Sequence, residues 1–210
     1  MSNAQTDVSG EEMIVTVLSR QLSDGSVCLT GLSSMIPILS IGLARSTHAP
    51  DLTWISGAVG VDPEFETLDT GFTMQPDLWR GSTAYLGQVE QFWPMVQRRE
   101  TVNTFMISGA QVDQYGNVNS SLIGEYGDRK VCMMGSAGMG DMGPLGPPTY
   151  IWLTHHTPRT LVPAVDFISC PGYFDGGSER EDRGLPGGPE MLVTNRAVFD
   201  FEPGSHKVRL

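Results

Sequence analysis

The chain has 210 residues and a formal net charge of −11, because 24 aspartates and glutamates outnumber 13 lysines and arginines. Its hydrophobic content of 40% is sufficient for a core, and its length fits a single domain over residues 1–210. The acidic balance argues against a nucleic-acid binder, which needs a basic face, and against a polybasic membrane anchor.

The first 45 residues predict a helix, a strand and a second helix. Apolar spacing indicates the first helix over 9–22, where Ser9 and Glu12 form a capping box. The apolar run 27–30 indicates a short buried strand. A second helical stretch is expected over 34–45, beginning at a serine N-cap.

A second buried strand is expected at 52–56, and strand, helix and strand in this order form a βαβ unit with a parallel sheet. Ligands of such sheets bind at the carboxyl ends of strands, so the loop 56–60 is a candidate site. Another helix is expected within 82–99, where Pro94 must kink or end it. Further strands are expected at 102–108, 131–134, 150–154, 165–169, 191–194 and 198–201.

These elements predict an α/β fold with a mostly parallel central sheet and a loop-rich second half, where Gly and Pro concentrate at 135–148 and 171–189. The scattered cysteines Cys28, Cys132 and Cys170, in apolar surroundings, predict reduced packing thiols and a cytoplasmic protein. No basic, apolar signal precedes the first helix, and no apolar run is long enough to cross a membrane.

The glycine-rich segment 138–143 matches G-x-G-x-x-G, the dinucleotide fingerprint. The prolines that follow at 144, 147 and 148 argue that no helix can form there, so a dinucleotide site is rejected. The preceding loop 135–138 follows a predicted strand. It could present backbone N–H groups to an anion or an oxyanion, or it could be a plain turn.

The segment 108–120 is polar and follows a buried strand. Its amide side chains Gln111, Asn117 and Asn119 could contact a substrate or a neighbouring subunit, although a turn that satisfies its own backbone is favoured. The adjacent histidines at 155 and 156 would face opposite sides of a strand, and no Cys/His cluster is present, so no metal site is expected.

Taken together, these segments resemble a β-type subunit of the family I CoA-transferases, and most of all the glutaconate CoA-transferase β subunit. Subunits of this type are often longer at the C-terminus than this chain. The resemblance covers nearly the whole sequence, and the segments that carry it are 48–51, 109–120, 135–138, 166–173, 183–189 and 192–194.

The resemblance implies a three-layer CoA-transferase-type fold, a homologous α-type subunit in a heterodimer or heterotetramer, and an acyl-CoA substrate, with coenzyme A as part of the substrate and no separate cofactor. In such transferases a β-subunit glutamate in an E-S-G or E-N-G loop, after an early strand, attacks the thioester beside an oxyanion hole.

This chain departs from that pattern, because its loop over 54–60 reads W-I-S-G-A-V-G. Gly57, or Ile55 with a one-residue gap, falls at the glutamate position, and neither is a nucleophile. The carboxylates that follow at 62, 64 and 66 lie too far along the chain. We therefore expect a hydrolase or a lyase/decarboxylase; the alternatives are a transferase with a displaced nucleophile, a non-catalytic partner of the α subunit, and a nucleotide-binding module.

The site expected from the resemblance consists of two loops, and neither identifies the acyl group of the substrate. The nucleotide end of CoA would be held by the partner or by a basic pair, Arg98–Arg99 or Arg129–Lys130. Ala137 replaces a glycine of the family's Gly-Ser-Gly-Gly loop. This replacement keeps the backbone N–H but leaves less room between the loop and the substrate. The catalytic loop is Ser56, Gly57 and Ala58, and the thioester-binding loop is Ser136, Ala137 and Gly138.

Overall fold

The computed structural model describes residues 7–31, 34–57, 60–64, 81–96, 98, 100–145 and 147–210. Its main sheet contains strands β1 Val27–Thr30, β2 Thr53–Ile55, β3 Gly60–Val61, β4 Ala84–Tyr85, β5 Thr104–Ile107, β10 Thr149–Leu153, β12 Pro189–Thr194, β13 Val198–Phe201 and β14 Val208–Arg209. The strand order is β14-β13-β12-β10-β5-β1-β2-β3-β4. The central run from β12 to β2 is parallel, and the flanking strands are antiparallel.

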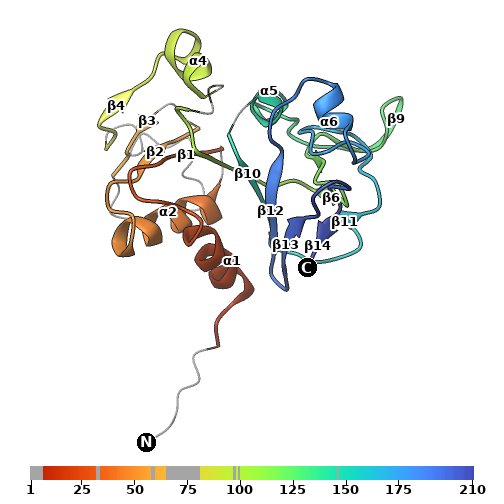
Figure 1. The fold of residues 1–210 in the computed structure, drawn as a ribbon, viewed down its shortest axis with the longest axis horizontal. Helices are drawn as coiled ribbons and strands as arrows, with labels where there is room; N and C mark the ends of the chain where they lie inside the picture. The colour runs from red at the N-terminus through yellow and green to blue at the C-terminus, as the bar shows by residue number, and fades with distance from the viewer. Residues whose placement is uncertain are drawn as a thin grey trace, which may run out of the picture.

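Helices cover both faces of this sheet (Figure 1). On one face, α1 (Gly10–Ser19) and α2 (Met35–Thr47) bury side chains such as Trp54 and Met106. The next residues along the same strands, such as Ile55, point to the opposite face, because side chains alternate along a strand. That face carries the π-helical turn η2 (Gln88–Phe92), α4 (Trp93–Val96) and α5 (Met139–Leu145). The predicted α/β fold with a mostly parallel sheet is confirmed.

The second half of the chain adds two small sheets beside α5. One contains β11 (Leu161–Val162), β6 (Gln111–Asp113) and β7 (Val118–Asn119), in that order. The other is a two-stranded ribbon of β8 (Leu122–Glu125) and β9 (Asp128–Cys132), and the short helix α6 follows at Glu179–Asp182.

The predicted first helix and its cap are confirmed: the Ser9 hydroxyl accepts the Glu12 N–H at 3.1 Å, and the Glu12 carboxylate accepts the Ser9 N–H at 2.7 Å. The helix expected within 82–99 is present, since helical residues run without a gap from Gln88 to Val96, as η2 and then α4. The helix changes from π to α form at Trp93, one residue before Pro94, which has no backbone N–H to donate, so the irregularity expected at this proline is confirmed.

Two expected strands are corrected. The strand predicted at 131–134 lies earlier, as β9, and ends at Cys132. The segment 165–169 is not a strand, because its pairing is reduced to an isolated bridge between Val118 and Cys170. Its residues instead form hydrogen bonds with Gln111, Val118 and Ser120, in and next to the strands of the neighbouring hairpin β6–β7.

The expectation that no helix follows the glycine-rich loop is wrong, since α5 begins directly after Gly138. Pro144 is tolerated because it lies in the last turn, where its ring removes one helical hydrogen bond. The Arg180 guanidinium then donates to the terminal carbonyls of Gly143 and Pro144, at 2.8 and 3.2 Å. The strand before this loop, β9, belongs to a two-stranded antiparallel ribbon rather than to a parallel βαβ unit, so the geometry of the dinucleotide fingerprint is still not met.

The three cysteines are free and differ in environment. Cys28 and Cys170 are buried, and burial raises the pKa of both thiols, for Cys170 to about 12. Cys132 is exposed, contrary to the packing role predicted for it, because all of β9 faces solvent. Within the described ranges, no helix is long and apolar enough to cross a membrane.

Candidate functional site

Ser56 closes the turn at the carboxyl end of β2. Its N–H donates to the Gly60 carbonyl at 2.9 Å, and its Oγ accepts the Gly60 N–H at 3.2 Å. The residue is 3% exposed, so its hydroxyl lies inside the turn rather than in solvent. Gly57 follows in the same turn, and Ala58 lies outside the described residues.

The first carboxylate after this turn is held by a cation. Asp62 forms an ion pair with Arg45 of α2, and its Oδ1 also accepts the Trp54 N–H at 2.7 Å. The Arg45 Nε donates to the Leu52 carbonyl at 2.8 Å, so the pair ties α2 to the start of β2. Asp62 therefore lies on the amino side of the Ser56 turn, away from the carboxyl ends of the strands.

The loop 135–138 has the backbone geometry of an anion nest. Gly135 and Ala137 have φ angles of 89° and 44°, whereas Ser136 and Gly138 between and after them are not left-handed. Such alternation turns successive N–H groups to one side. The N–H groups of Ala137 and Gly138 donate no hydrogen bond to the described part of the chain. The two N–H groups are therefore available to donate hydrogen bonds to an anionic oxygen.

Ala137 is strained in this loop, because a left-handed φ brings Cβ against the backbone. We expect Ala137→Gly to raise the free energy of unfolding by about 0.5–1 kcal/mol, the strain relief exceeding the added backbone entropy. Urea denaturation of the two proteins measures the change. The matched control is Ala197→Gly, where φ is not left-handed and the same substitution should lower stability by about 0.5–1 kcal/mol. Equal losses at both positions would contradict the strain.

Trp93 connects the nest to the end of β2. A Cβ on Gly138 would lie 2.6 Å from the Trp93 ring, so only glycine allows this approach. The Trp93 ring packs edge-on against Phe92, with ring centres 5.3 Å apart. Phe92 belongs to the same buried cluster as Ile55, the residue before Ser56. The Phe92–Trp93 pair thus connects the nest to the apolar cluster on the face of the sheet that Ile55 also enters.

The predicted polar residues of the hairpin β6–β7 are buried: Gln111, Asn117 and Asn119 are 7%, 2% and 0% exposed. Asn119 donates from Nδ2 to Gln111 Oε1 and to the Leu122 carbonyl, both at 2.7 Å. Gln111 in turn bonds the Asp166 carboxylate from Nε2 at 3.2 Å. These amides hold the hairpin to its neighbours, and contact with a substrate or subunit stays a prediction.

Asn117 has the densest set of contacts in this network. Its Nδ2 donates to both carboxylate oxygens of Asp113, at 3.1 and 2.9 Å, and to the Phe174 carbonyl at 2.8 Å. Its Oδ1 accepts the N–H groups of Gly172 and Phe174 at 2.9 and 3.1 Å. Burial raises the pKa of Asp113, against the hydrogen bonds from Asn117 and the backbone, which lower it.

Ser120 joins the hairpin to the anion nest. The Ser120 Oγ donates to the Gly135 carbonyl at 2.9 Å, and the Gly135 N–H donates to the Ser120 carbonyl at 3.1 Å. The Ser120 N–H is held by Ser169 Oγ at 2.9 Å. The buried amide network therefore positions the start of the 135–138 loop.

Arg180 is a structural residue that the sequence reasoning missed. It is 2% exposed, and its guanidinium donates to five main-chain carbonyls at 2.7–3.3 Å. These carbonyls belong to Gly143, Pro144, Pro171, Gly172 and Pro186. One side chain thus joins the end of α5 to two loops. No sequence signal separates it from Arg183, which has the same acidic neighbours and is exposed.

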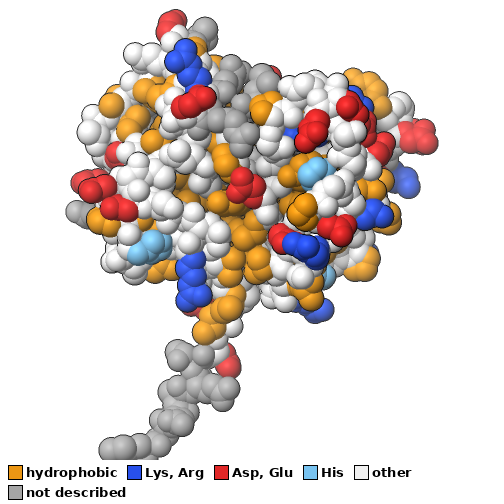
Figure 2. Space-filling view, in the orientation of Figure 1, with side chains coloured by type: hydrophobic (Ala, Val, Ile, Leu, Met, Phe, Trp, Pro, Cys, Tyr) orange, Lys and Arg blue, Asp and Glu red, His pale blue; other side chains and the backbone are white. Residues whose placement is uncertain are grey.

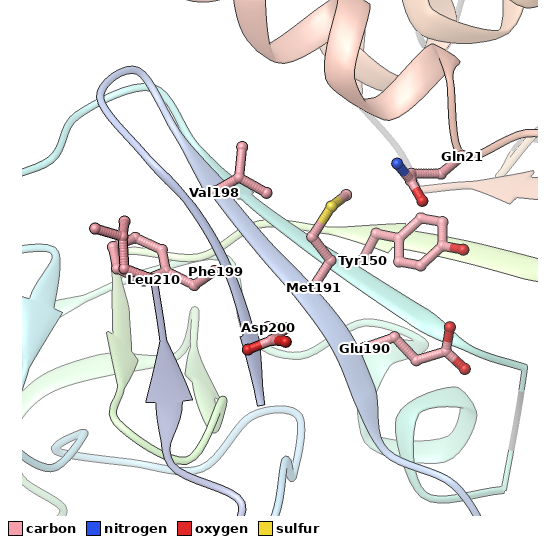
Figure 3. A pocket seen from close by; sticks show the side chains of 8 residues that line it. All are labelled: Gln21, Tyr150, Glu190, Met191, Val198, Phe199, Asp200 and Leu210. Atoms are coloured by element: carbon pink, nitrogen blue, oxygen red, sulfur yellow. The ribbon is translucent and has the colours of Figure 1, made fainter. Parts of the chain in front are cut away.

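A cavity of about 380 Å³ lies near the amino ends of β10 and β12, whereas the predicted loops follow the carboxyl ends of strands (Figure 3). None of the site residues predicted from the sequence lines it. In Figure 2, hydrophobic side chains gather on this face between α1 and strands β12 and β13. The lining residues are Gln21, Tyr150, Glu190, Met191, Val198, Phe199, Asp200 and Leu210.

The two adjacent histidines after β10 take part in local hydrogen bonds. His155 Nδ1 lies 2.9 Å from Thr154 Oγ1, and His156 Nδ1 lies 2.9 Å from Thr194 Oγ1. Over the described residues, no group of three or more His, Cys, Asp or Glu side chains could hold a metal ion.

Comparison with known proteins gives a family match over residues 11–208, to a model described as coenzyme A transferase. The B subunit of 3-oxoadipate CoA-transferase from Pseudomonas knackmussii is 30% identical over 210 residues, covering 95% of this chain and 75% of that protein. The IpdB subunit of the cholesterol ring-cleaving hydrolase of Mycobacterium tuberculosis is 29% identical over 191 residues, covering 85% and 68%.

Two solved structures match over nearly the whole chain. Glutaconate CoA-transferase from Acidaminococcus fermentans superposes with a TM-score of 0.84 at 26% identity, covering 98% of this chain and 79% of that one. The decarboxylase AibA/AibB superposes with a TM-score of 0.81 at 28% identity, covering 97% and 77%. One fold is thus shared by a transferase and a decarboxylase.

Proposed function

The chain belongs to the coenzyme A transferase family as a β-type subunit, and on that premise we propose that it acts, together with an α-type subunit, on a CoA thioester by hydrolysis or C–C cleavage rather than by CoA transfer. Relatives with this fold are named as a ring-cleaving hydrolase and as a decarboxylase, as well as transferases. The chain is therefore a subunit of an acyl-CoA enzyme family in which the reaction varies.

The observation that supports the proposal is that the turn after β2, residues 56–60, contains no carboxylate side chain. Ser56 is closed into its own turn, and Gly57 has no side chain. Asp62, the first carboxylate on the chain after the turn, is engaged by Arg45 and the Trp54 N–H. A double displacement through a glutamyl thioester needs a carboxylate free to attack and to leave.

The residues of the 135–138 loop supply the other half of the proposal. The N–H groups of Ala137 and Gly138 would stabilise the oxyanion that develops when the thioester carbonyl is attacked or polarised. Ser136 would sit beside them, and Ser56, Gly57 and Ala58 would shape the pocket wall. The attacking group then comes from the α-type subunit or from water.

Adduct trapping separates this proposal from transfer. The assembled pair is incubated with an acyl-CoA, treated with hydroxylamine or borohydride, and digested for mass spectrometry. We expect no acyl or CoA adduct on this chain, and turnover without a carboxylic-acid acceptor. Thioester hydrolysis would release free CoA, whereas C–C cleavage would convert the acyl-CoA into a different acyl-CoA with the thioester intact. An adduct on Glu64, or on Glu66, which lies outside the described residues, with transfer between two acids faster than hydrolysis, would instead support a transferase with a displaced nucleophile.

The second candidate is a non-catalytic partner that only supports the α subunit. Gly138→Val, combined with Trp93→Leu to make room, changes the nest while the contact between α4 and the loop is kept apolar. Lost turnover with intact assembly supports a catalytic role for the loop. Unchanged turnover with intact assembly supports the scaffold.

A further inference from the structure

The ribbon β8–β9 projects from the second half of the molecule (Figure 1). All five residues of β9 are exposed. A two-stranded ribbon is marginally stable alone in water, so it needs an anchor. Asp166 provides one, since its Oδ2 accepts the Gly124 N–H at 2.9 Å and the Gln111 Nε2–H at 3.2 Å. The ribbon is thus fixed to the same amide network that positions the anion nest.

An aromatic platform lies at the tip of this ribbon. Tyr126 is 75% exposed, and its ring stacks on Phe167 with centres 6.3 Å apart and planes 23° apart. The Arg129 guanidinium lies 6.0 Å from the centre of the same ring. Planar bases stack readily on exposed aromatic rings and on guanidinium groups, so this platform offers a surface on which a base can stack.

Two cations adjoin the platform. Arg129 and Lys130 are consecutive and exposed, and neither forms an ion pair within the described part of the chain. The ribbon also carries Glu125 and Asp128, which lie opposite each other on its two strands, next to the tip. The net charge of the ribbon is therefore zero. Arg129 and Lys130 can each donate charge-assisted hydrogen bonds to phosphate oxygens, so this pair next to an aromatic ring favours a phosphate-bearing ligand over a purely apolar one. In the other basic pair expected from the sequence, Arg99 lies outside the described residues.

We propose that the exposed tip of the ribbon, with Tyr126, Arg129 and Lys130, binds the phosphorylated adenosine end of the CoA thioester, with the base on Tyr126 beside Arg129 and the phosphates at the two consecutive cations. This inference rests on the proposed function. β9 leads through Met133 and Met134 directly into the anion nest at 135–138. A residue of extended strand spans about 3.4 Å, so the platform and the nest are separated by a strand's length, as the two ends of a long thioester require.

The test titrates the isotope-labelled chain with CoA, with adenosine 3′,5′-bisphosphate and with pantetheine, and follows backbone and ring signals by NMR. CoA and the bisphosphate should shift the signals of Tyr126, Phe167 and Arg129, and pantetheine should not. Tyr126→Ala and Arg129→Gln should each weaken CoA binding about fivefold or more, and added salt should weaken it further. Asp128→Asn should tighten it.

Matched controls are Tyr85→Ala and Arg159→Gln, which remove an exposed tyrosine and an exposed arginine elsewhere, and both should leave the affinity unchanged. Equal affinity in the Tyr126 and Arg129 variants, or equal ribbon shifts with pantetheine, would overturn the inference. So would loss of assembly with the α-type subunit and no change in nucleotide binding, which makes the ribbon a subunit contact. The titration reports binding and not turnover, so nucleotide binding can succeed even where the proposed reaction fails.

Discussion

Replacing Arg180 with lysine should lower the free energy of unfolding by about 3–5 kcal/mol, because a point-like ammonium cannot reproduce the planar fork of the guanidinium. The buried fork donates to five carbonyls from the end of α5 and from two loops. Carbonyls left unbonded in the interior cost about 1–3 kcal/mol each. Urea denaturation measures the loss, and faster amide exchange in α5 should accompany it.

Arg183→Lys is the matched control, three residues further along. Arg183 is about half exposed, pairs with Glu179 one helical turn away and lies 4.2 Å over the Phe174 ring. An exposed pair and an exposed cation–π contact of this kind are worth about 1 kcal/mol or less. Similar losses in the two variants would show that burial of the Arg180 fork does not stabilise α5.

Asn117→Asp should be the second severe substitution, although it changes one atom. It replaces a donor that bonds Asp113 twice and Phe174 once by an oxygen, which places two buried carboxylates about one hydrogen bond apart. We expect a loss of about 4 kcal/mol or more at pH 7. Repulsion raises the folded-state pKa of the pair, which burial already raises for Asp113. The deficit should therefore shrink as the pH falls and one carboxyl gains a proton.

Two further variants test the cause of that loss. Asn103→Asp makes the same change at an exposed site, where the side-chain oxygen accepts the Val27 N–H at 2.7 Å, and should cost about 0.5 kcal/mol or less. The swap Asp113→Asn with Asn117→Asp restores one donor between the two side chains and should recover part of the stability. A swap no better than Asn117→Asp alone would contradict the repulsion.

The main sheet could be predicted from the sequence because its signals are local. The capping box at Ser9 and Glu12, the apolar run of β1 and the following helix each depend on neighbours within a few residues. The small sheets could not be predicted in the same way. β6, β7 and β11 have two or three residues, too few for a periodicity, and depend on buried side-chain amides for their place.

The candidate site likewise has some features that could be predicted from the sequence and others that could not. The glycines of the 135–138 loop, and the absence of any aspartate or glutamate from residues 56–60, can be read directly from the sequence. α5 could not be predicted, because the side chain that binds its last carbonyls lies more than thirty residues away along the chain. The ion pair between Arg45 and Asp62 could not be predicted either, since nothing in the sequence around a single basic residue on α2 indicates which carboxylate it contacts.

The order of strands in the main sheet has a consequence for how the chain folds. β1 is made first during synthesis, yet it lies in the middle of the sheet, and its neighbour β5 follows 76 residues later. Pairing over such separations makes a chain slow to fold, on the scale of milliseconds to seconds. Until β5 emerges, β1 has an unpaired edge, and an unpaired strand edge is a site at which a nascent chain can aggregate.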